Sequence, residues 1–253
     1  MIYLKSNADI AIIRDNGKIL TEIFKKLNEI IKTGISTKNI DTIVENIIYS
    51  HSAVPSFKGY RGFPAATCVS VNAEVVHGIP GSCILKEGDI VGVDVGVYKN
   101  GFHADAARTF PVGMISAEAE RLINVTRESF FEGVKRVVIG NRVMDISAAI
   151  QRYVESAGFG VIRDMLGHGI GRSVHEKPDV PNYGLPGKGP KLRAGMVLAV
   201  EPMVSQGDFR IVTQSNGWTT VTKDGKLSAH YENTLAVTKD GPLILTLNDG
   251  DVF

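Results

Sequence analysis

Two aspartates stand inside apolar stretches, where a carboxylate is costly. The segment GVDVGVYKNGFHADAARTF (residues 92–110) places Asp94 and Asp105 among valines and alanines. Burying such a charge is strongly unfavourable unless a cation lies against it. The pattern therefore indicates that these carboxylates bind one or two metal ions. The alternative is a pair of solvated acids on an exposed face of a strand.

A tight turn brings the two aspartates together. Asn100-Gly101 is a strong signal for a two-residue β-hairpin turn. With that turn, Asp94 faces Ala107 on the neighbouring strand. Asp94 and Asp105 are then diagonal neighbours on one face, with backbones about 7–8 Å apart. Side chains that lean together from there can converge on a cation, or on two cations about 3.5–4 Å apart.

The second half of the chain adds imidazoles and further acids. The segment LGHGIGRSVHEKP (166–178) supplies His168 and His175, and Glu201 and Glu232 follow. A carboxylate-rich set with one or two imidazoles suits Mn²⁺, Fe²⁺, Co²⁺ or Zn²⁺. Spacing alone does not select the ligands from this set.

Two other histidines compete for the same role. His103 and His230 each lie two residues before an acid, Asp105 and Glu232 respectively, so on a strand they share the face of that acid. From the residues alone they are alternative ligands. His51 is expected to be an ordinary surface or helix-end histidine.

Regular elements must hold these residues in place. Ser6 and Asp9 resemble a capping box, and the apolar residues behind them recur at helical spacing until Gly34. A second helix is predicted over about residues 38–50. Strands punctuated by glycine and proline follow it.

The same order of elements then repeats. From Ser116 a helix is predicted to about Val138 and another over about 145–157, again followed by strands. We infer a single domain over residues 1–253, built as a duplicated α+β unit whose halves, about 1–112 and 113–253, share one sheet. The matching segments are GDIVGVD (88–94) with GMVLAVE (195–201), and HADAARTF (103–110) with HYENTLAV (230–237).

Composition describes a globular chain without an evident nucleic-acid or membrane role. The 253 residues are 43% hydrophobic and 22% charged, with a net charge of +1. The densest basic stretch, KGPKLR (188–193), is expected to be a solvated loop, so no sequence-specific nucleic acid is predicted. No apolar run approaches 18 residues, and the amino terminus lacks the apolar region of a secretory signal. Two cysteines without a disulfide pattern favour the reducing cytoplasm.

Six motifs together resemble the methionine aminopeptidases of type I, in their short bacterial form. The resemblance covers nearly the whole chain, and the motifs occur in the order typical of that family. It implies the pita-bread fold, an α+β fold with pseudo-twofold halves and helices packed on a central curved antiparallel sheet. The motifs are VVHGIP (75–80), VDVGV (93–97), GFHADAARTF (101–110), GHGIGRSVHEKP (167–178), AVEPMV (199–204) and YENTLAVT (231–238).

The length between two of the motifs indicates type I rather than type II. Type II enzymes carry a helical insert before the final metal-binding glutamate. Only the 30 residues 202–231 lie between Glu201 and Glu232, which leaves no room for that insert. An amino-terminal zinc-binding extension is not expected either.

The resemblance also assigns the metal ligands. It implies two divalent ions (Co, Mn, Fe, Zn or Ni), with Asp105 and Glu232 bridging them. Asp94 chelates one ion, and His168 with Glu201 holds the other. His103 and His230 are not ligands in that family.

Roles for further residues follow from the resemblance as well. His77 and His175 are implied to contact the substrate. Metal-bound hydroxide would attack the first peptide bond, with Glu201 passing a proton to the leaving amine. The implied methionine pocket is lined by Phe57, Tyr60, Phe63, Cys68, Val174 and Trp218. Val174 departs from the bulkier aromatic residue often found at that position.

The activity expected from this resemblance is removal of the initiator methionine from nascent chains whose second residue is small. The expected substrates are the amino termini of nascent polypeptides, and the expected state is a monomer. Transient ribosome contact would suit such an enzyme. Two alternatives are a proline-specific aminopeptidase or prolidase, which usually carries a further amino-terminal domain, and a non-catalytic pita-bread binding module that has lost metal ligands.

Overall fold

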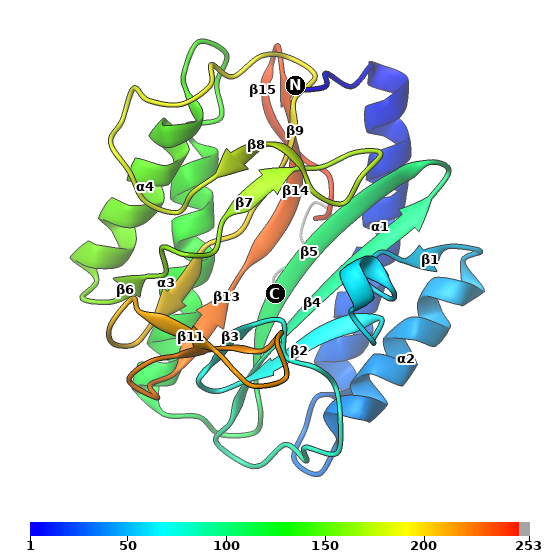
Figure 1. The fold of residues 1–253 in the computed structure, drawn as a ribbon, viewed down its shortest axis with the longest axis vertical. Coiled ribbons are helices and arrows are strands. Elements are labelled where there is room, and N and C mark those ends of the chain that lie inside the picture. Colours follow the sequence, from blue (N-terminus) through cyan, green and yellow to red (C-terminus); the bar gives the residue numbers. More distant parts are fainter. Residues whose placement is uncertain (248–253) are drawn as a thin grey trace.

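A curled antiparallel sheet runs through the middle of the molecule, with one pair of helices on each side of it in the view of Figure 1. The computed structural model describes residues 1–247, so the last six residues of the predicted second half lie outside the described residues. The helices are α1 (Asn7–Ile30), α2 (Thr37–Ser50), α3 (Ala117–Val134) and α4 (Val143–Ser156), with a short 3₁₀ helix η1 (Tyr60–Gly62). The strands are β1 (Val54–Pro55), β2 (Thr67–Val71), β3 (Glu74–Val76), β4 (Ile90–Lys99), β5 (Phe102–Pro111), β6 (Gly160–Val161), β7 (Gly167–Gly169), β8 (Glu176–Val180), β9 (Val197–Val200), β10 (Met203–Ser205), β11 (Ile211–Thr213), β12 (Thr220–Thr222), β13 (Ser228–His230), β14 (Glu232–Thr238) and β15 (Gly241–Ile244).

The first helix begins at the predicted capping box. Asp9 donates its backbone N–H to Ser6 Oγ, and Ser6 donates its own to the Asp9 carboxylate. These two bonds satisfy donors that an open helix start would leave unpaired. Helix α2 also lies where the sequence predicts it.

The two later helices differ from the prediction at one end each. Helix α3 ends at Val134 rather than near Val138, because the next residues close i→i+3 turns, such as the one from Val137 N–H to the Val134 carbonyl. Helix α4 begins at Val143 rather than at Asp145. The Asp145 carboxylate accepts the backbone N–H of Arg142, so this acid caps the helix from its first turn.

The predicted hairpin is confirmed. Strands β4 and β5 pair with Asp94 opposite Ala107. Asn100 and Gly101 have φ angles of 53° and 83°, the left-handed values that a tight two-residue hairpin turn requires.

The middle of the sheet brings the two halves of the sequence together. Strand β5 pairs with β14, which places Ala107 opposite Glu232, and β14 pairs with β9. The order β4-β5-β14-β9 therefore sets Asp94, Asp105 and Glu232 on three adjacent strands, and Glu201 directly follows the fourth.

Each pair of helices covers its own hydrophobic core. Helix α1 packs on β4 and β5, and α2 packs on β1 and β2, with Phe24 and Val95 in this first core. Helices α3 and α4 pack on each other and enclose the second core with Phe130 and Leu198. Neither core contains the acids themselves, but both contain residues of the strands that carry the acids. Packing in the two cores therefore holds these strands in place.

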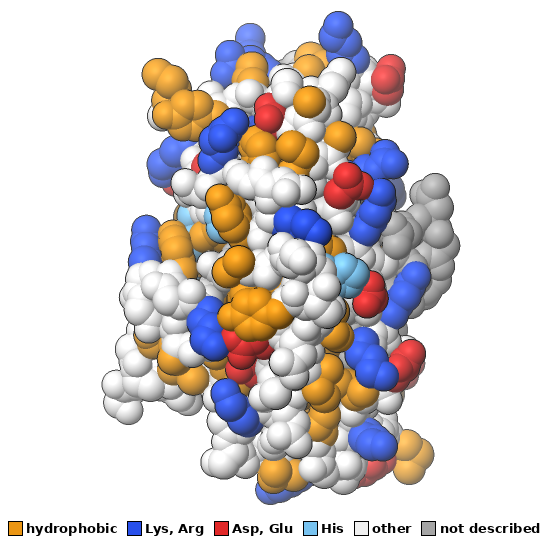
Figure 2. All heavy atoms as spheres, turned by 90° about the vertical axis from the view of Figure 1, so that its right-hand side faces the viewer, with side chains coloured by type: hydrophobic (Ala, Val, Ile, Leu, Met, Phe, Trp, Pro, Cys, Tyr) orange, Lys and Arg blue, Asp and Glu red, His pale blue; other side chains and the backbone are white. Residues whose placement is uncertain are grey.

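The surface of the molecule carries charges of both signs. On the face in Figure 2, lysine and arginine side chains are interspersed with acidic ones. Residues 188–193 form a mostly exposed loop, as predicted. No helix within residues 1–247 combines the length and apolarity needed to cross a lipid bilayer.

Candidate active site

Four carboxylates and several imidazoles line one cavity of about 160 Å³ at the middle of the sheet. All but one of the thirteen residues predicted to form the site line it, and Val174 packs behind it against the same aromatic side chains. The lining residues are Phe57, Tyr60, Arg61, Phe63, Cys68, His77, Asp94, Asp105, His168, His175, Glu201, Trp218 and Glu232.

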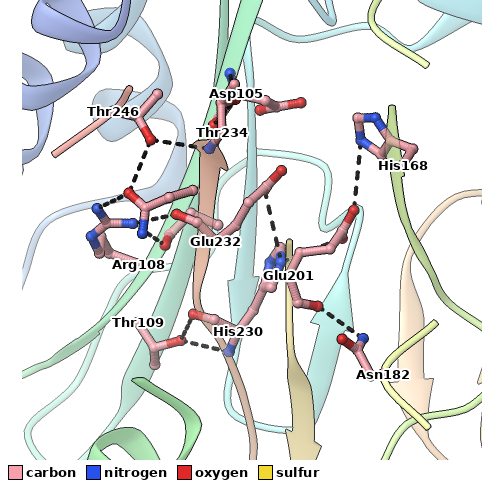
Figure 3. Close-up of polar contacts among 12 residues, drawn as sticks. Asp105, Arg108, Thr109, His168, Asn182, Glu201, His230, Glu232, Thr234 and Thr246 are labelled. Atoms are coloured by element: carbon pink, nitrogen blue, oxygen red, sulfur yellow. Dashed lines mark hydrogen bonds and ion pairs between the residues drawn. The ribbon is translucent and has the colours of Figure 1, made fainter. Parts of the chain in front are cut away.

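One group of donors has the geometry of a metal site. Single ligand atoms of Asp105, His168 and Glu232 lie within 4.8 Å of one another. Glu201 approaches the same group, with its Oε1 atom 3.6 Å from His168 Nε2 (Figure 3). Separations of this size suit donors around one ion, since metal–ligand bonds are about 2.0–2.2 Å long.

The buried oxygens of this group test whether a cation fits. Asp94 Oδ1, Asp105 Oδ1 and Glu232 Oε1 have no hydrogen-bond partner among residues 1–247. Asp105 and Glu232 are only 3% and 2% exposed. Buried oxygens without donors are costly, and divalent ions are the partners that satisfy several carboxylates at once. The residues present therefore fit a divalent metal.

Burial makes it hard for these acids to ionise without a cation. Burial raises the pKa of Asp105 to about 7. Burial and the charge of Asp105 raise the pKa values of Asp94 and Glu201 well above their usual range. The same two causes raise the pKa of Glu232. Four acids in one cavity are thus held partly protonated until positive charge is supplied.

The competing histidines occupy different surroundings. His103 Nδ1 forms a hydrogen bond with Ser56 Oγ at 2.9 Å, and the ring packs on Tyr98. His103 does not line the cavity. His230 points toward the acids instead, and together with Glu201 and Glu232 it forms a second group of close donor atoms. His51 caps the end of α2 beside Glu22, as expected for a helix-end residue.

Two further histidines stand at the mouth of the cavity. His175 Nδ1 lies 3.0 Å from the Tyr60 hydroxyl, and its ring centre lies 4.2 Å from that of His168. His77 follows β3 in a left-handed conformation with φ of 59° and faces Trp218 edge-on. Desolvation lowers the pKa values of both His77 and His175, so both rings are neutral near pH 7 and can donate one N–H.

An apolar pocket adjoins the acids. Phe57, Phe63, Cys68 and Val174 are buried there, with Tyr60 and Trp218 at its edge. Cys68 pairs directly with Asp94 across β2 and β4, which joins the pocket to the acid cluster. Gly96 lets this wall close, since a Cβ atom there would lie 2.6 Å from Ser56 Cβ.

Several residues that shape the site were not predicted. Arg108 is buried between the rings of Phe24 and Tyr231 and donates to the Glu232 carbonyl. An arginine inside an apolar strand is as unusual as an aspartate there, so the sequence alone could have indicated that Arg108 has buried partners. Arg61 lines the cavity mouth with φ of 50°, and nothing in its sequence context marks it.

Side chains from distant segments form hydrogen bonds with the backbone of two of the acids, Asp105 and Glu201. Thr234 exchanges two hydrogen bonds with the backbone of Asp105, of 2.8 and 2.9 Å, across β5 and β14. Asn182, fully buried, donates its amide to the Glu201 carbonyl at 2.9 Å (Figure 3). Both contacts join residues far apart in sequence, and no local pattern marks them.

Comparison with known proteins gives consistent results along the chain. The model of metallopeptidase family M24 matches residues 11–239. A methionine aminopeptidase of Clostridium perfringens is 59% identical over 247 residues, which are 98% of this chain and 99% of that protein. The crystal structure of a Thermotoga maritima methionine aminopeptidase matches with a TM-score of 0.96 at 46% identity, over 98% of this chain and 100% of that one.

A more distant structure shares the fold alone. The prolidase of Pyrococcus furiosus matches with a TM-score of 0.80 at 21% identity, over 97% of this chain but 66% of that one. Together with the closer matches, this likeness confirms the predicted pita-bread fold. Between Glu201 and Glu232 the structure has only strands β10–β13, so the predicted absence of a helical insert is also confirmed.

Proposed function

The chain belongs to metallopeptidase family M24, and on that basis we propose that it is a methionine aminopeptidase of type I. It removes the initiator methionine from proteins and peptides whose second residue is small. The observation that carries the proposal is the convergence of four carboxylates and His168 on one cavity that continues into an apolar pocket.

Five residues hold the metal in this proposal. Asp94, Asp105, His168, Glu201 and Glu232 would bind two divalent ions, and oxygen-rich donors with one imidazole accept Mn²⁺, Fe²⁺, Co²⁺, Ni²⁺ or Zn²⁺. Bound metal would polarise the scissile carbonyl and acidify the attacking water. The free α-amine of the substrate belongs at the same centre, which restricts cleavage to amino-terminal residues.

The side chains around the metals move the protons. Glu201 accepts the proton of the attacking water and passes it to the leaving amine, because it lies at the edge of the donor group, with Oε1 3.6 Å from His168 Nε2. Neutral His175 donates to the developing oxyanion, and neutral His77 to the scissile amide. Tyr60 orients His175 through the contact to its Nδ1 atom.

The pocket supplies the preference for methionine. Phe57, Phe63 and Trp218 pack in one hydrophobic cluster with Cys68. A polarizable thioether packs well against such walls. The acids and the two histidines crowd the position of the second residue, which favours a small side chain there.

The finer assignments belong to the same proposal. The chain is one catalytic domain with halves of about 1–112 and 113–253. It acts as a monomer in the cytoplasm on nascent amino termini, with transient contact to the ribosome. The likeness to prolidases is one of fold, and this chain spans two thirds of the length of the Pyrococcus furiosus prolidase.

Peptide hydrolysis tests the proposal directly. The chelator-treated protein is incubated with Met-Ala-Ser or Ala-Pro peptides, with and without Mn²⁺ or Co²⁺. We expect metal-dependent release of methionine from Met-Ala-Ser. Release of alanine from Ala-Pro alone would indicate the proline-specific alternative, and failure both to bind metal and to cleave either peptide would indicate a binding module.

A further inference from the structure

His230 is a buried imidazole that the proposed mechanism does not use. It ends β13, two residues before Glu232, and is 4% exposed. Thr109 fixes its backbone, accepting the His230 N–H and donating to its carbonyl, both at 2.9 Å. The ring points into the acid cluster, with Nε2 3.5 Å from Glu201 Oε2 and 3.9 Å from Glu232 Oε2 (Figure 3).

We infer that His230 is a positioning residue that donates its Nε2–H to Glu201 and thereby turns the other carboxylate oxygen toward the metal. This inference rests on the proposed function, because it gives Glu201 the roles of metal ligand and proton acceptor. The ring itself touches neither metal nor substrate.

The surroundings of Nε2 determine which form of the ring is present. Nε2 has no hydrogen-bond partner within the described residues, and the two polar groups nearest to it are carboxylates. With metal bound the two acids are ionised, so a bare nitrogen lone pair would face two carboxylates, whereas an N–H is attracted to them. The neutral ring therefore carries its proton on Nε2. A shift of about 0.6 Å brings it to an ordinary hydrogen-bond length of about 2.9 Å from Glu201 Oε2.

The two oxygens of Glu201 face different imidazoles. Oε1 lies 3.6 Å from Nε2 of His168, which belongs to the group of close donors with Asp105 and Glu232, and Oε2 lies 3.5 Å from His230 Nε2. Asn182 holds the backbone of the same residue. Glu201 is thus fixed at its carbonyl by Asn182 and at one carboxylate oxygen by His230, and the other oxygen is left for the metal. Hydrogen bonds of this kind typically contribute about 10–100-fold to metal affinity.

Substitutions at His230 separate this role from that of a ligand. His230→Gln keeps an N–H donor near the position of Nε2, whereas His230→Leu removes it. His103→Leu is the matched control, because His103 also stands two residues before an acid but bonds Ser56. The readouts are Mn²⁺ affinity and stoichiometry by calorimetry on metal-free protein, the visible spectrum of the Co²⁺ form, and kcat.

The expected pattern is specific. His230→Leu weakens Mn²⁺ binding about 10–100-fold at unchanged stoichiometry, shifts the Co²⁺ spectrum and lowers kcat, and His230→Gln restores most of each loss. His103→Leu changes none of the three. Wild-type affinity in His230→Leu overturns the inference. Loss of one metal equivalent in both His230 variants also overturns it, since His230 would then be a ligand.

A measurement on the unchanged protein covers the case in which His230→Leu does not fold. Nitrogen-15 NMR of histidine-labelled, Zn²⁺-loaded protein reports the protonated ring nitrogen, with His230→Gln used to assign the signal. A proton on Nε2 is expected, and a proton on Nδ1 alone refutes the inference. Failure of the wild type to bind metal or release methionine would instead count against the proposed function.

Discussion

Asp105 on β5 and Glu232 on β14 bring carboxylate oxygens within 4.8 Å of each other and of a His168 ring nitrogen, although the two acids are 127 residues apart in sequence. The pairing of Ala107 with Glu232 makes this possible, because it offsets the acids by two residues across adjacent strands. Two buried carboxylates held this close can both ionise only when a cation lies between them. Removing either one should therefore disable the site.

The first prediction concerns Asp105→Asn. We expect the loss of divalent-metal binding to exceed the roughly 100-fold effect of losing an outer hydrogen bond, with methionine release abolished. The metal-free variant should be more stable than metal-free wild type at pH 8, because one costly buried charge is gone. Calorimetry and thermal unfolding measure both effects. Asp179→Asn, an exposed acid paired with Lys177, is the control, and metal binding by Asp105→Asn at wild-type affinity would contradict the assignment.

The histidines at the cavity mouth should behave differently from the histidine at its base. His77→Ala or His175→Ala should lower kcat by about 10²–10⁴-fold, the usual contribution of a positioned proton donor, with metal content retained. His168→Ala should lose metal as well as activity. Metal analysis beside kinetics separates the two classes. If His168→Ala kept its metal while His103→Ala lost it, the ligand assignment would be wrong.

Stability of the metal-free protein should fall as pH rises from about 6.5 to 8. The pKa of Asp105 is raised to about 7 in the folded state, against about 3.9 in an unfolded chain. The folded state therefore binds more protons than the unfolded state across this window, and rising pH favours unfolding. The raised pKa values of Glu201 and Glu232 act in the same direction.

The buried histidines set the lower limit of that window. The pKa of His168 is lowered to about 4 and that of His230 to about 3, both by burial. Unfolded histidines are half protonated at about pH 6.5, and their effect opposes that of the acids until they have lost their protons at about pH 7.5. This opposition fades as the pH rises, so the rise in Tm caused by Mn²⁺ should grow toward pH 8. A metal-free Tm that is flat over this range in wild type would contradict burial of the acids as the cause, and Asp105→Asn should show a shallower slope than wild type.

Local chemistry in the sequence predicted the hairpin and most helix positions. Asn100-Gly101 determines its own turn, and the Ser6–Asp9 capping box needs no distant partner. The helix ends that differed, at Val134 and Val143, depend on turns that apolar spacing does not encode. Turns and helix starts that depend on residues close together in sequence could therefore be predicted.

Contacts between segments far apart in sequence could not be predicted in the same way. His103 and His230 have the same relation to an acid in sequence, but Ser56 and Tyr98 hold His103, whereas His230 meets Glu201 across the sheet. Strand periodicity places both rings on the face of their acid, and only tertiary packing distinguishes them. The resemblance to a known family named the ligands, but it did not predict the contact between His230 and Glu201.

A buried ion pair should stabilise the segment that carries His175. Lys5 Nζ lies 2.6 Å from Glu176 Oε2, and these side chains are 5% and 9% exposed. Lys5→Met leaves the carboxylate buried without its cation, which typically costs about 3–5 kcal/mol. Urea unfolding should show this loss and also partial recovery in Lys5→Met with Glu176→Gln. Lys177→Met, which breaks an exposed pair two residues from His175, should cost at most about 1 kcal/mol. Equal costs for the two lysines would show that burial does not matter for this pair.

The last prediction concerns the side chain that follows the methionine. The chain itself begins Met1-Ile2, so peptides with the sequence of residues 1–5 and the same peptides with Ile2→Ala form a matched pair. In the proposed mechanism the substrate's second residue lies beside the four carboxylates, His77 and His175, which line a cavity of about 160 Å³. We expect a branched side chain there to clash with these walls. One methylene alone changes binding by about 1–3 kcal/mol, and a steric clash can exceed that. We therefore expect kcat/KM for the alanine peptide to exceed that for the isoleucine peptide by at least about 100-fold, measured by mass spectrometry of released methionine. Similar rates for the two peptides would refute the small-residue rule while leaving the metal assignment intact.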